Sequence, residues 1–274
     1  MSYKTIAVQV EPGERGARAL AVALDLAQGH DAHLIGVAAK QPIYIPTYAA
    51  AQVPPELFES FQQEQDKALA EAKAAFDKAV SASGRTDRAE YRLLQGDLLD
   101  VMEAAARLAD IIVVSQWNPG IDPATDEPLV DSLVIHAGRP VLVVPYIGAP
   151  ASIGRRVLVA WNNSREAARA VADALPFLKG AAKVSVVTAD AEADEVPGAD
   201  IARYLAEHGV KAEITRTRSG DLDVGPALLS MAADGGYDLL VMGAYGKSRV
   251  REMVLGGASN HIIRHMTLPV VMSH

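Results

Sequence analysis

The sequence predicts an α/β protein built from two tandem, doubly wound, parallel-sheet domains. Three observations carry this prediction: the apolar runs are short and continuous, helical patterns alternate with them, and the whole series occurs twice. Continuous apolar strands, as opposed to alternating ones, are typical of parallel sheets that helices cover on both faces. A chain of 274 residues is long enough for two domains of ordinary size.

The duplication is visible at five landmarks that recur in the same order. The first strand and helix of the chain, residues 5–10 and 17–27, correspond to residues 156–161 and 165–175. The other three landmark pairs are residues 96–98 with 220–222, 109–114 with 237–242, and 139–144 with 268–272. A repeat of this kind predicts two copies of one domain, which we place at residues 1–147 and 154–274.

Between these landmarks, each half alternates strands with crossover helices. In the first half we expect a long charged helix from about Glu56 to Ser83, a helix at Leu98–Leu108 and a buried strand at Ile111–Val114. The second half is expected to hold the strand 184–188, the helices 201–208, 224–233 and 262–266, and the strand 239–242. Because parallel α/β sheets bind ligands beyond the carboxyl ends of their strands, function is expected in the strand-to-helix loops.

Composition excludes several classes of function. The chain carries 26 Lys and Arg against 34 Asp and Glu, a net charge of −8, and the whole negative excess lies in residues 1–147. This balance argues against binding nucleic acid or an anionic membrane by bulk charge. With no cysteine, thiolate metal sites and cysteine nucleophiles are ruled out. We read no secretion signal and no membrane-spanning segment, so a cytoplasmic location is expected.

A glycine-rich segment follows the apolar run 239–242. Gly243 and Gly246 allow backbone N–H groups to approach a phosphate closely, and Gly256 and Gly257 precede a helix start at which Ser259 lies. Local positive charge comes from Lys247, Arg249 and Arg251. We interpret the segment as a phosphate cradle with two limbs; the alternative is that these glycines only shape turns. It is not a P-loop, because Val241 stands where that motif needs its first glycine.

The spacing Gly-x2-Gly-x9-Gly, with small residues after it and an apolar-Pro-Val-Val strand at the end, resembles the universal stress protein family, and the duplicated chain resembles its tandem members. The resemblance implies a Rossmann-like, adenine nucleotide alpha hydrolase-like fold whose halves are related by a pseudo-twofold axis. It also implies that ATP or another adenine nucleotide is bound, with Gly243, Gly246 and Gly256 at the phosphates and Ser259 near them. A regulatory or stress-protective role is implied too.

Further site residues follow from the family resemblance. Val187 and Thr188, at the end of the second strand of this half, would offer backbone contacts to adenine. The chain departs from the family at two positions: Gly257 replaces a Ser or Thr, and Asn162 replaces an Asp near the ribose and metal. Because an amide brings no charge to a divalent cation, we expect nucleotide binding that depends weakly on Mg²⁺.

The first half has lost both glycine limbs. Ser115 and Asn118 stand where the second half has Gly243 and Gly246, and Glu127 and Pro128 stand opposite the second glycine pair. A carboxylate repels phosphate and proline lacks an N–H donor, so we expect no phosphate-bearing ligand at this position in the first half.

Other candidate residues give weaker evidence of function. We expect His261 and His265 to be surface or cap histidines rather than metal ligands, and Asp97 and Asp221 to cap helices. Trp117 and Trp161, at strand ends, can stack on a base or pack in the core. No catalytic residue is predicted.

Two other classes of function stay open. One is a slow ATPase or nucleotidyl transferase, for which Asp221 is the only candidate base. The other is a scaffold without ligand, which would bind a regulatory protein through the loop Ile43–Tyr48 and the long helix. By the resemblance, Val141–Val144 and Val270–Met272 would pair within the chain, and a homodimer of the whole chain is a further expectation.

Overall fold

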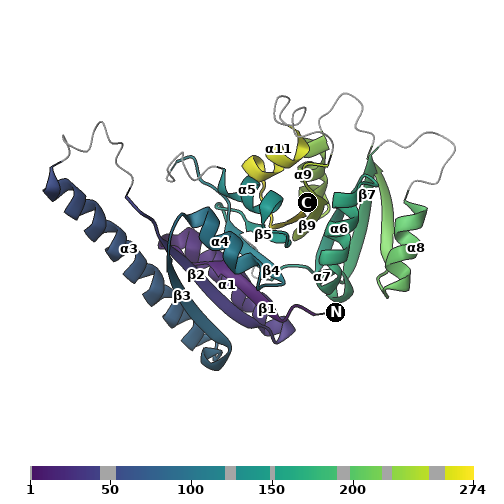
Figure 1. The fold of residues 1–274 in the computed structure, drawn as a ribbon. Coiled ribbons are helices and arrows are strands. Elements are labelled where there is room, and N and C mark those ends of the chain that lie inside the picture. Colours follow the sequence, from purple (N-terminus) through teal and green to yellow (C-terminus); the bar gives the residue numbers. More distant parts are fainter. Residues whose placement is uncertain are drawn as a thin grey trace.

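The computed structural model describes residues 2–43, 54–120, 128–148, 152–189, 198–217, 224–246 and 257–274. Over these residues the chain forms a 10-stranded sheet with helices on both faces (Figure 1). The strand order is β3-β2-β1-β4-β5-β10-β9-β6-β7-β8, so each half has its third, second, first, fourth and fifth strands in the same sequence. The predicted α/β class and the duplication are therefore confirmed.

The elements of the first half alternate as expected. They are β1 (Thr5–Gln9), α1 (Gly13–His30), β2 (His33–Lys40), α3 (Pro55–Ala82), the short 3-10 helix η1 (Thr86–Arg88), β3 (Ala89–Gln95), α4 (Leu98–Ala106), β4 (Ile111–Ser115), α5 (Leu129–His136) and β5 (Val141–Val144).

The second half repeats the series with shorter connections. Its elements are β6 (Arg156–Trp161), α6 (Arg165–Asp173), α7 (Leu175–Gly180), β7 (Lys183–Ala189), α8 (Ala199–Glu207), β8 (Ala212–Thr217), α9 (Val224–Asp234), β9 (Leu239–Gly243), α11 (Ala258–His265) and β10 (Val270–Ser273). The helix predicted over 165–175 is present as α6, which ends two residues earlier, at Asp173; α7 follows it, with Pro176 in its first turn.

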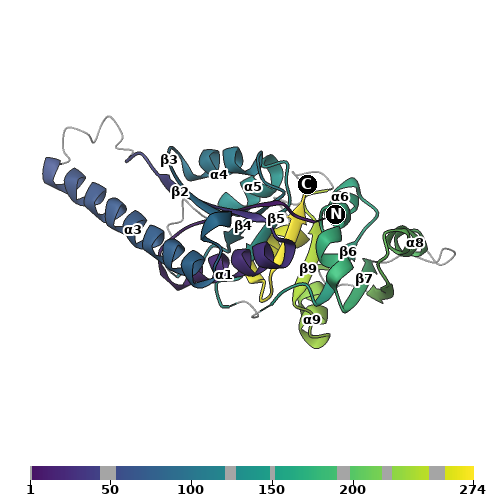
Figure 2. The ribbon, with the colours of Figure 1, turned by 90° about the horizontal axis from the view of Figure 1, so that it is seen from below.

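Two apolar layers hold the helices to the sheet. Residues of α1, α3, α6, α7 and α8 pack on one face, and residues of α4, α5, α9 and α11 pack on the other. In the first half, α1 and α4 are seen on opposite sides of the strands in Figure 2. All five residues of β4 and all four of β5 are buried, which explains why their sequences are continuously apolar.

The two halves are joined edge to edge by their last strands. β5 and β10 pair antiparallel, with Val143 opposite Val270, Leu142 opposite Val271 and Val141 opposite Met272. Every other strand pair in the sheet is parallel. The pairing expected between Val141–Val144 and Val270–Met272 is confirmed, and it makes one continuous sheet of both halves.

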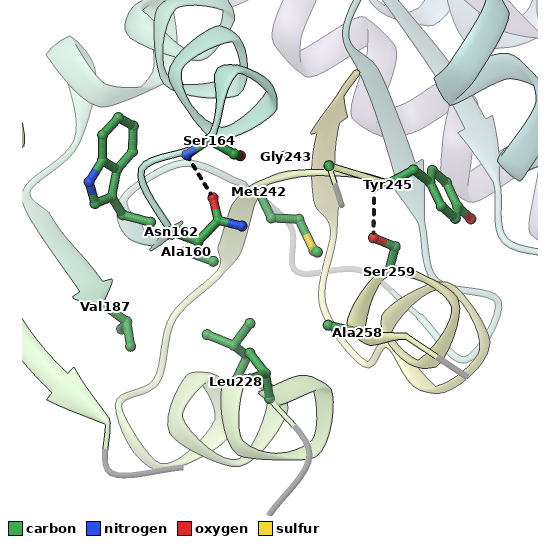
Figure 3. Close-up of a pocket in the computed structure, with 13 residues that line it drawn as sticks. Ala160, Asn162, Ser164, Val187, Leu228, Met242, Gly243, Tyr245, Ala258 and Ser259 are labelled. Atoms are coloured by element: carbon green, nitrogen blue, oxygen red, sulfur yellow. Dashed lines mark hydrogen bonds between the residues drawn. The ribbon is translucent and has the colours of Figure 1, made fainter. Parts of the chain in front are cut away.

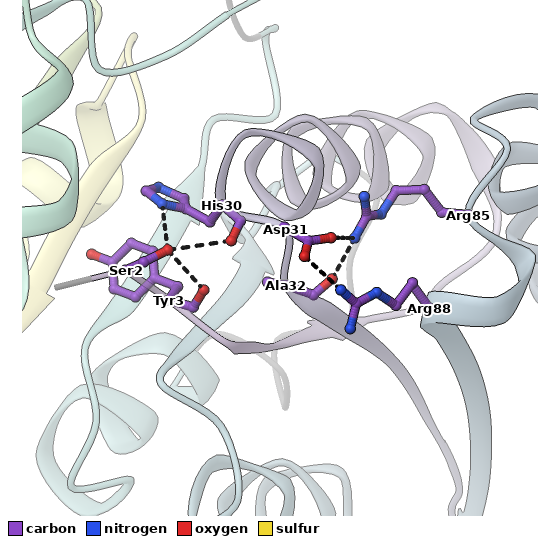
Figure 4. Close-up of polar contacts among 7 residues, drawn as sticks. All are labelled: Ser2, Tyr3, His30, Asp31, Ala32, Arg85 and Arg88. Carbon is purple, nitrogen blue, oxygen red and sulfur yellow. Dashed lines mark hydrogen bonds and ion pairs between the residues drawn. The ribbon is translucent and has the colours of Figure 1, made fainter.

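The long helix α3 packs on the core through its carboxyl-terminal half, and Gln65 and Asp66 add polar contacts to Gln41 and Lys40 after β2. Its buried residues are Ala72, Phe76 and Val80, whereas its first half extends beyond the sheet (Figure 1). After the helix, Arg85 Nη2 donates to the carbonyl of Ala32 at 2.6 Å, and Arg88 Nη2 lies 2.5 Å from an oxygen of Asp31 (Figure 4). These contacts fix the turn into β3 against the end of α1.

No helix in the described part of the chain combines the length and the apolar character that a membrane span requires. The loop Ile43–Tyr48, considered above as a partner surface, lies outside the described residues except for Ile43.

The packing of α3 against β2 gives a stability prediction. A Cβ on Gly36 of β2 would lie 2.4 Å from Cε2 of Phe76, so Gly36→Ala should lower the free energy of unfolding by about 1–3 kcal/mol through overpacking. The matched control is Gly29→Ala in α1, where a Cβ meets nothing within 4 Å and alanine favours the helix. Urea unfolding curves of both variants measure the difference; equal stability of Gly36→Ala and the wild type would contradict this packing.

Candidate nucleotide site

A pocket opens beyond the carboxyl ends of β6, β7 and β9 in the second half. Its empty space is about 730 Å³, part of which is open to solvent. The first turn of α9 and the start of α11 close two of its sides (Figure 3). The lining residues are Ala160, Trp161, Asn162, Ser164, Val187, Val224, Leu228, Met242, Gly243, Tyr245, Gly246, Ala258 and Ser259.

Most of the residues that the sequence singled out meet at this pocket. Asn162, Val187, Gly243, Gly246 and Ser259 all line it, although they come from three strand ends and one helix. Of the remaining candidates, the buried Thr188 and the helix-capping Gly257 are next to lining residues but are not lining residues themselves. Gly256 lies outside the described residues, as do Lys247, Arg249, Arg251 and Asp221.

The first glycine limb lies directly on the start of α6. A Cβ on Gly243 would be 2.4 Å from the backbone nitrogen of Ala167, and one on Gly246 would be 2.7 Å from Oε2 of Glu166. Gly243 is therefore required by close approach, because the backbone of α6 occupies the space of a side chain. At Gly246 the nearest atom is the end of the Glu166 side chain.

The two limbs are tied together by Ser259. The backbone N–H of Tyr245 donates to Oγ of Ser259 at 3.3 Å, and the Ser259 side chain is buried (Figure 3). Tyr245 has a φ of 57°, a left-handed conformation that is costly for a residue with a side chain. The limbs thus form a single structured unit, in which Tyr245 holds a strained backbone conformation.

The start of α11 offers a positive helix end to the pocket. Gly257 is its N-cap, and no side chain makes a cap hydrogen bond there. The first turn contains no acidic residue. By contrast, Ser164 caps α6 and Glu166 lies in its first turn, so α6 already has an internal carboxylate at its positive end. Of these two helices, α11 is the one suited to an anion.

Glu166 is a site residue that the sequence analysis missed. It is 2% exposed, and its carboxylate is paired with the guanidinium of Arg165. Burial opposes ionisation, but hydrogen bonds from Arg165, from its own backbone N–H and from Ser164 outweigh burial and lower the pKa of Glu166. A carboxylate that is ionised at neutral pH therefore lies beneath the first limb. In the sequence, the signal for this residue was a glutamate two positions after Ser164, the serine that caps α6.

The other side of the pocket is apolar. Ala160, Val187, Leu228 and Met242 line it from β6, β7, α9 and β9. Trp161 is half-buried; it lines the pocket and also packs against the apolar core. Asn162 uses its Oδ1 to accept from the backbone N–H of Ser164 at 3.2 Å, so this side chain shapes the turn into α6.

The equivalent position in the first half holds a smaller cavity, with about 270 Å³ of empty space against about 730 Å³ in the second half. A second cavity of about 510 Å³, at the starts of α4 and α5, adjoins it. Glu11, which corresponds to Asn162, forms an ion pair there with Arg15, which corresponds to Glu166. Ser115 and Trp117 line what remains. Pro128 directly precedes α5, as expected, and Glu127 lies outside the described residues.

Metal ligands do not gather in the described ranges: no three His, Asp or Glu side chains there are arranged to hold an ion. The rings of His261 and His265 stack with their centroids 4.3 Å apart, and Nδ1 of His265 lies 2.9 Å from the carbonyl oxygen of His261. Asp97 caps α4 by accepting from the N–H of Leu99 at 2.9 Å, which confirms its expected structural role.

Comparison with known proteins identifies the family. The model of the universal stress protein family matches residues 2–145 and again 154–274, so the chain belongs to this family and carries two of its domains. No curated protein sequence matches the chain.

Solved structures confirm the fold over the full length. A universal stress protein from Archaeoglobus fulgidus DSM 4304 is similar with a TM-score of 0.71 and 16% identity, over 98% of this chain and 95% of that one. A protein of unknown function from Pseudomonas aeruginosa PAO1 gives 0.58 and 16%, over 99% and 92%. A universal stress protein in complex with cAMP matches 53% of this chain and 98% of that one, with a TM-score of 0.38 and 22% identity.

The lowered pKa of Glu166 gives a pH prediction. A carboxyl whose folded pKa lies below its unfolded value stabilises the fold above the unfolded pKa, and this stabilisation is lost as the pH falls through the folded one. Glu166→Gln should therefore destabilise the protein at pH 7, and its deficit relative to the wild type should shrink as the pH falls below the ordinary glutamate value of about 4.3. Chemical denaturation from pH 7 to about pH 3 measures this; a deficit that grows on acidification would contradict it.

Proposed function

We propose that this universal stress protein binds an adenine nucleotide in the pocket of its second half and acts through the bound state in a regulatory or stress-protective role. The observation that carries the proposal is the union, in one pocket, of an apolar wall with close-packed glycines and the uncapped start of α11. The first half serves this site as structure and does not bind a second phosphate ligand.

The apolar wall suits a nucleobase. Val187 and Leu228 lie on either side of the pocket in Figure 3, and Ala160 and Met242 line it above them. A flat base buried there would remove apolar surface from water, while backbone groups at the end of β7 remain available for its edge. We place the contacts of Val187 and Thr188 with adenine here.

The glycine limbs suit the phosphates. Gly243 and Gly246 line the pocket without side chains, and Gly243 lets the first limb lie close against the start of α6. Ala258 and Ser259, in the first turn of α11, line the pocket beside them. Backbone N–H groups at a helix start, together with the helix dipole, bind an anion without any metal. We place Gly256 and Gly257 in this second limb by their position in the sequence.

Binding can be tested with a charge placed in the first limb. ATP, ADP or AMP should raise the Tm of the wild type by several degrees, because a ligand at 100 times its Kd stabilises by about 2.7 kcal/mol. Gly246→Glu should abolish the shift by placing a second carboxylate beside Glu166 and the phosphates. Asn118→Glu, at the corresponding position of the first half, is the matched control and should keep the full shift.

A gain-of-function variant provides an independent test in case Gly246→Glu fails to fold. Gly257 has a φ of −48°, which any residue adopts, so Gly257→Ser can supply both a cap for α11 and the missing hydroxyl. This variant should bind nucleotide more tightly than the wild type. Absence of any nucleotide-induced shift in the wild type, with no co-purifying nucleotide in native mass spectrometry, would overturn the proposal.

The amide at position 162 gives a metal prediction. Since Asn162 brings no carboxylate to the site and its Oδ1 is already bonded to Ser164, nucleotide affinity should be nearly unchanged by EDTA or by added Mg²⁺. Asn162→Asp should make affinity rise with Mg²⁺. Titration of a fluorescent ATP analogue with and without Mg²⁺ measures both; a large loss of wild-type affinity on chelation would contradict this expectation.

A further inference from the structure

Two side chains of the first half reach across the join and contact the nucleotide site of the second. The hydroxyl of Tyr245, in the first glycine limb, donates to Oδ1 of Asp131 on α5. Nε2 of Gln116, at the end of β4, donates to the carbonyl of Ile263 on α11 at 2.8 Å. The first limb, and the helix α11 that begins at the second limb, are therefore each held by one residue of the other half.

The contact made by Gln116 is buried and uses its whole side-chain amide. Gln116 is 1% exposed, and its Oε1 accepts from the backbone N–H of Tyr146 at 3.2 Å, so both ends of its amide are bonded. The backbone of Tyr245 lines the pocket, while its ring points away from the pocket (Figure 3). The strained φ of Tyr245 persists because Ser259 holds its N–H and Asp131 holds its hydroxyl.

The amide contact has no counterpart in the opposite direction. The backbone N–H groups of Gln116 and Ala244 make the same bond in the two halves, to Val144 at 2.8 Å and to Ser273 at 2.9 Å, so these residues are structural equivalents. Ala244 has no amide with which to reach α5. Another contact across the join, Arg169 to the carbonyl of Gly138 at 2.6 Å, lies away from the glycine limbs.

We propose that Asp131 and Gln116 are positioning residues for the nucleotide site of the second half, so that the site is complete only with the first half in place. The degenerate half acts as a clamp: Asp131 fixes the first limb through Tyr245, and Gln116 fixes the second through α11. Nucleotide binding and the contact between the halves are thereby coupled, each favouring the other. This inference rests on the proposed binding of an adenine nucleotide.

A mutant cycle on the full-length protein tests the clamp, with ATP affinity measured by calorimetry. Tyr245→Phe and Asp131→Ala should each weaken binding about fivefold or more, and the double variant should weaken it no further than either single one. Asp131→Asn keeps an oxygen acceptor and should retain most of the affinity. Asp100→Ala removes an exposed carboxylate from α4 of the same half and is the matched control, with affinity unchanged.

Hydrogen exchange separates failure of the clamp from failure of the proposed function. Without any nucleotide, Asp131→Ala and Gln116→Met should speed amide exchange in residues 239–246 and 257–265, but not in β8. Wild-type ATP affinity in Tyr245→Phe, with unchanged exchange, would overturn the clamp and leave nucleotide binding intact. If the wild type binds no ATP, the proposed function fails. Unchanged amide exchange in both Asp131→Ala and Gln116→Met would then overturn the clamp as well.

Discussion

The antiparallel pairing of β5 with β10 is the constraint on which the rest of the structure depends. Without this pairing, β5 and β10 would each be an edge strand with unpaired backbone hydrogen-bonding groups, although every residue of both strands is apolar or small and is buried in the joined sheet. The pairing joins two parallel sheets into one and fixes α5 and α11 on the same face beside the join. Because of that placement, side chains of the first half reach the glycine limbs of the second. The geometry of the site is thus a consequence of how the duplicated halves meet.

Duplication has left one copy free to change its chemistry. In the second half, Asn162 lines an open pocket and the buried Glu166 lies beneath the first limb, whereas the corresponding Glu11 and Arg15 of the first half pair with each other beside a smaller cavity. The excess negative charge of the chain lies in this same half. Loss of one site is therefore consistent with its becoming support for the other.

Much of this could be predicted from the sequence. Continuous apolar strands and the repeat predict the parallel sheets, and the glycine spacing predicts the strand end at which the pocket lies. Contacts between distant segments could not be predicted, because tertiary placement leaves no local pattern in the sequence. Examples are Glu166 beneath Gly246, the left-handed backbone of Tyr245, and the hydrogen bond from Gln116 to α11. The short helix α7 was not predicted, although the expected helix ended just before Pro176, close to where α6 stops.

The central claim is that the chain has one nucleotide site, in its second half, built with support from the first. Equilibrium dialysis of the full-length protein against labelled ATP tests it most directly through the number of nucleotides bound per chain at saturation. The account predicts one per chain, whether or not the chains dimerise. Two per chain would show that the first half also binds, and none would show that neither half does; either result would contradict the account.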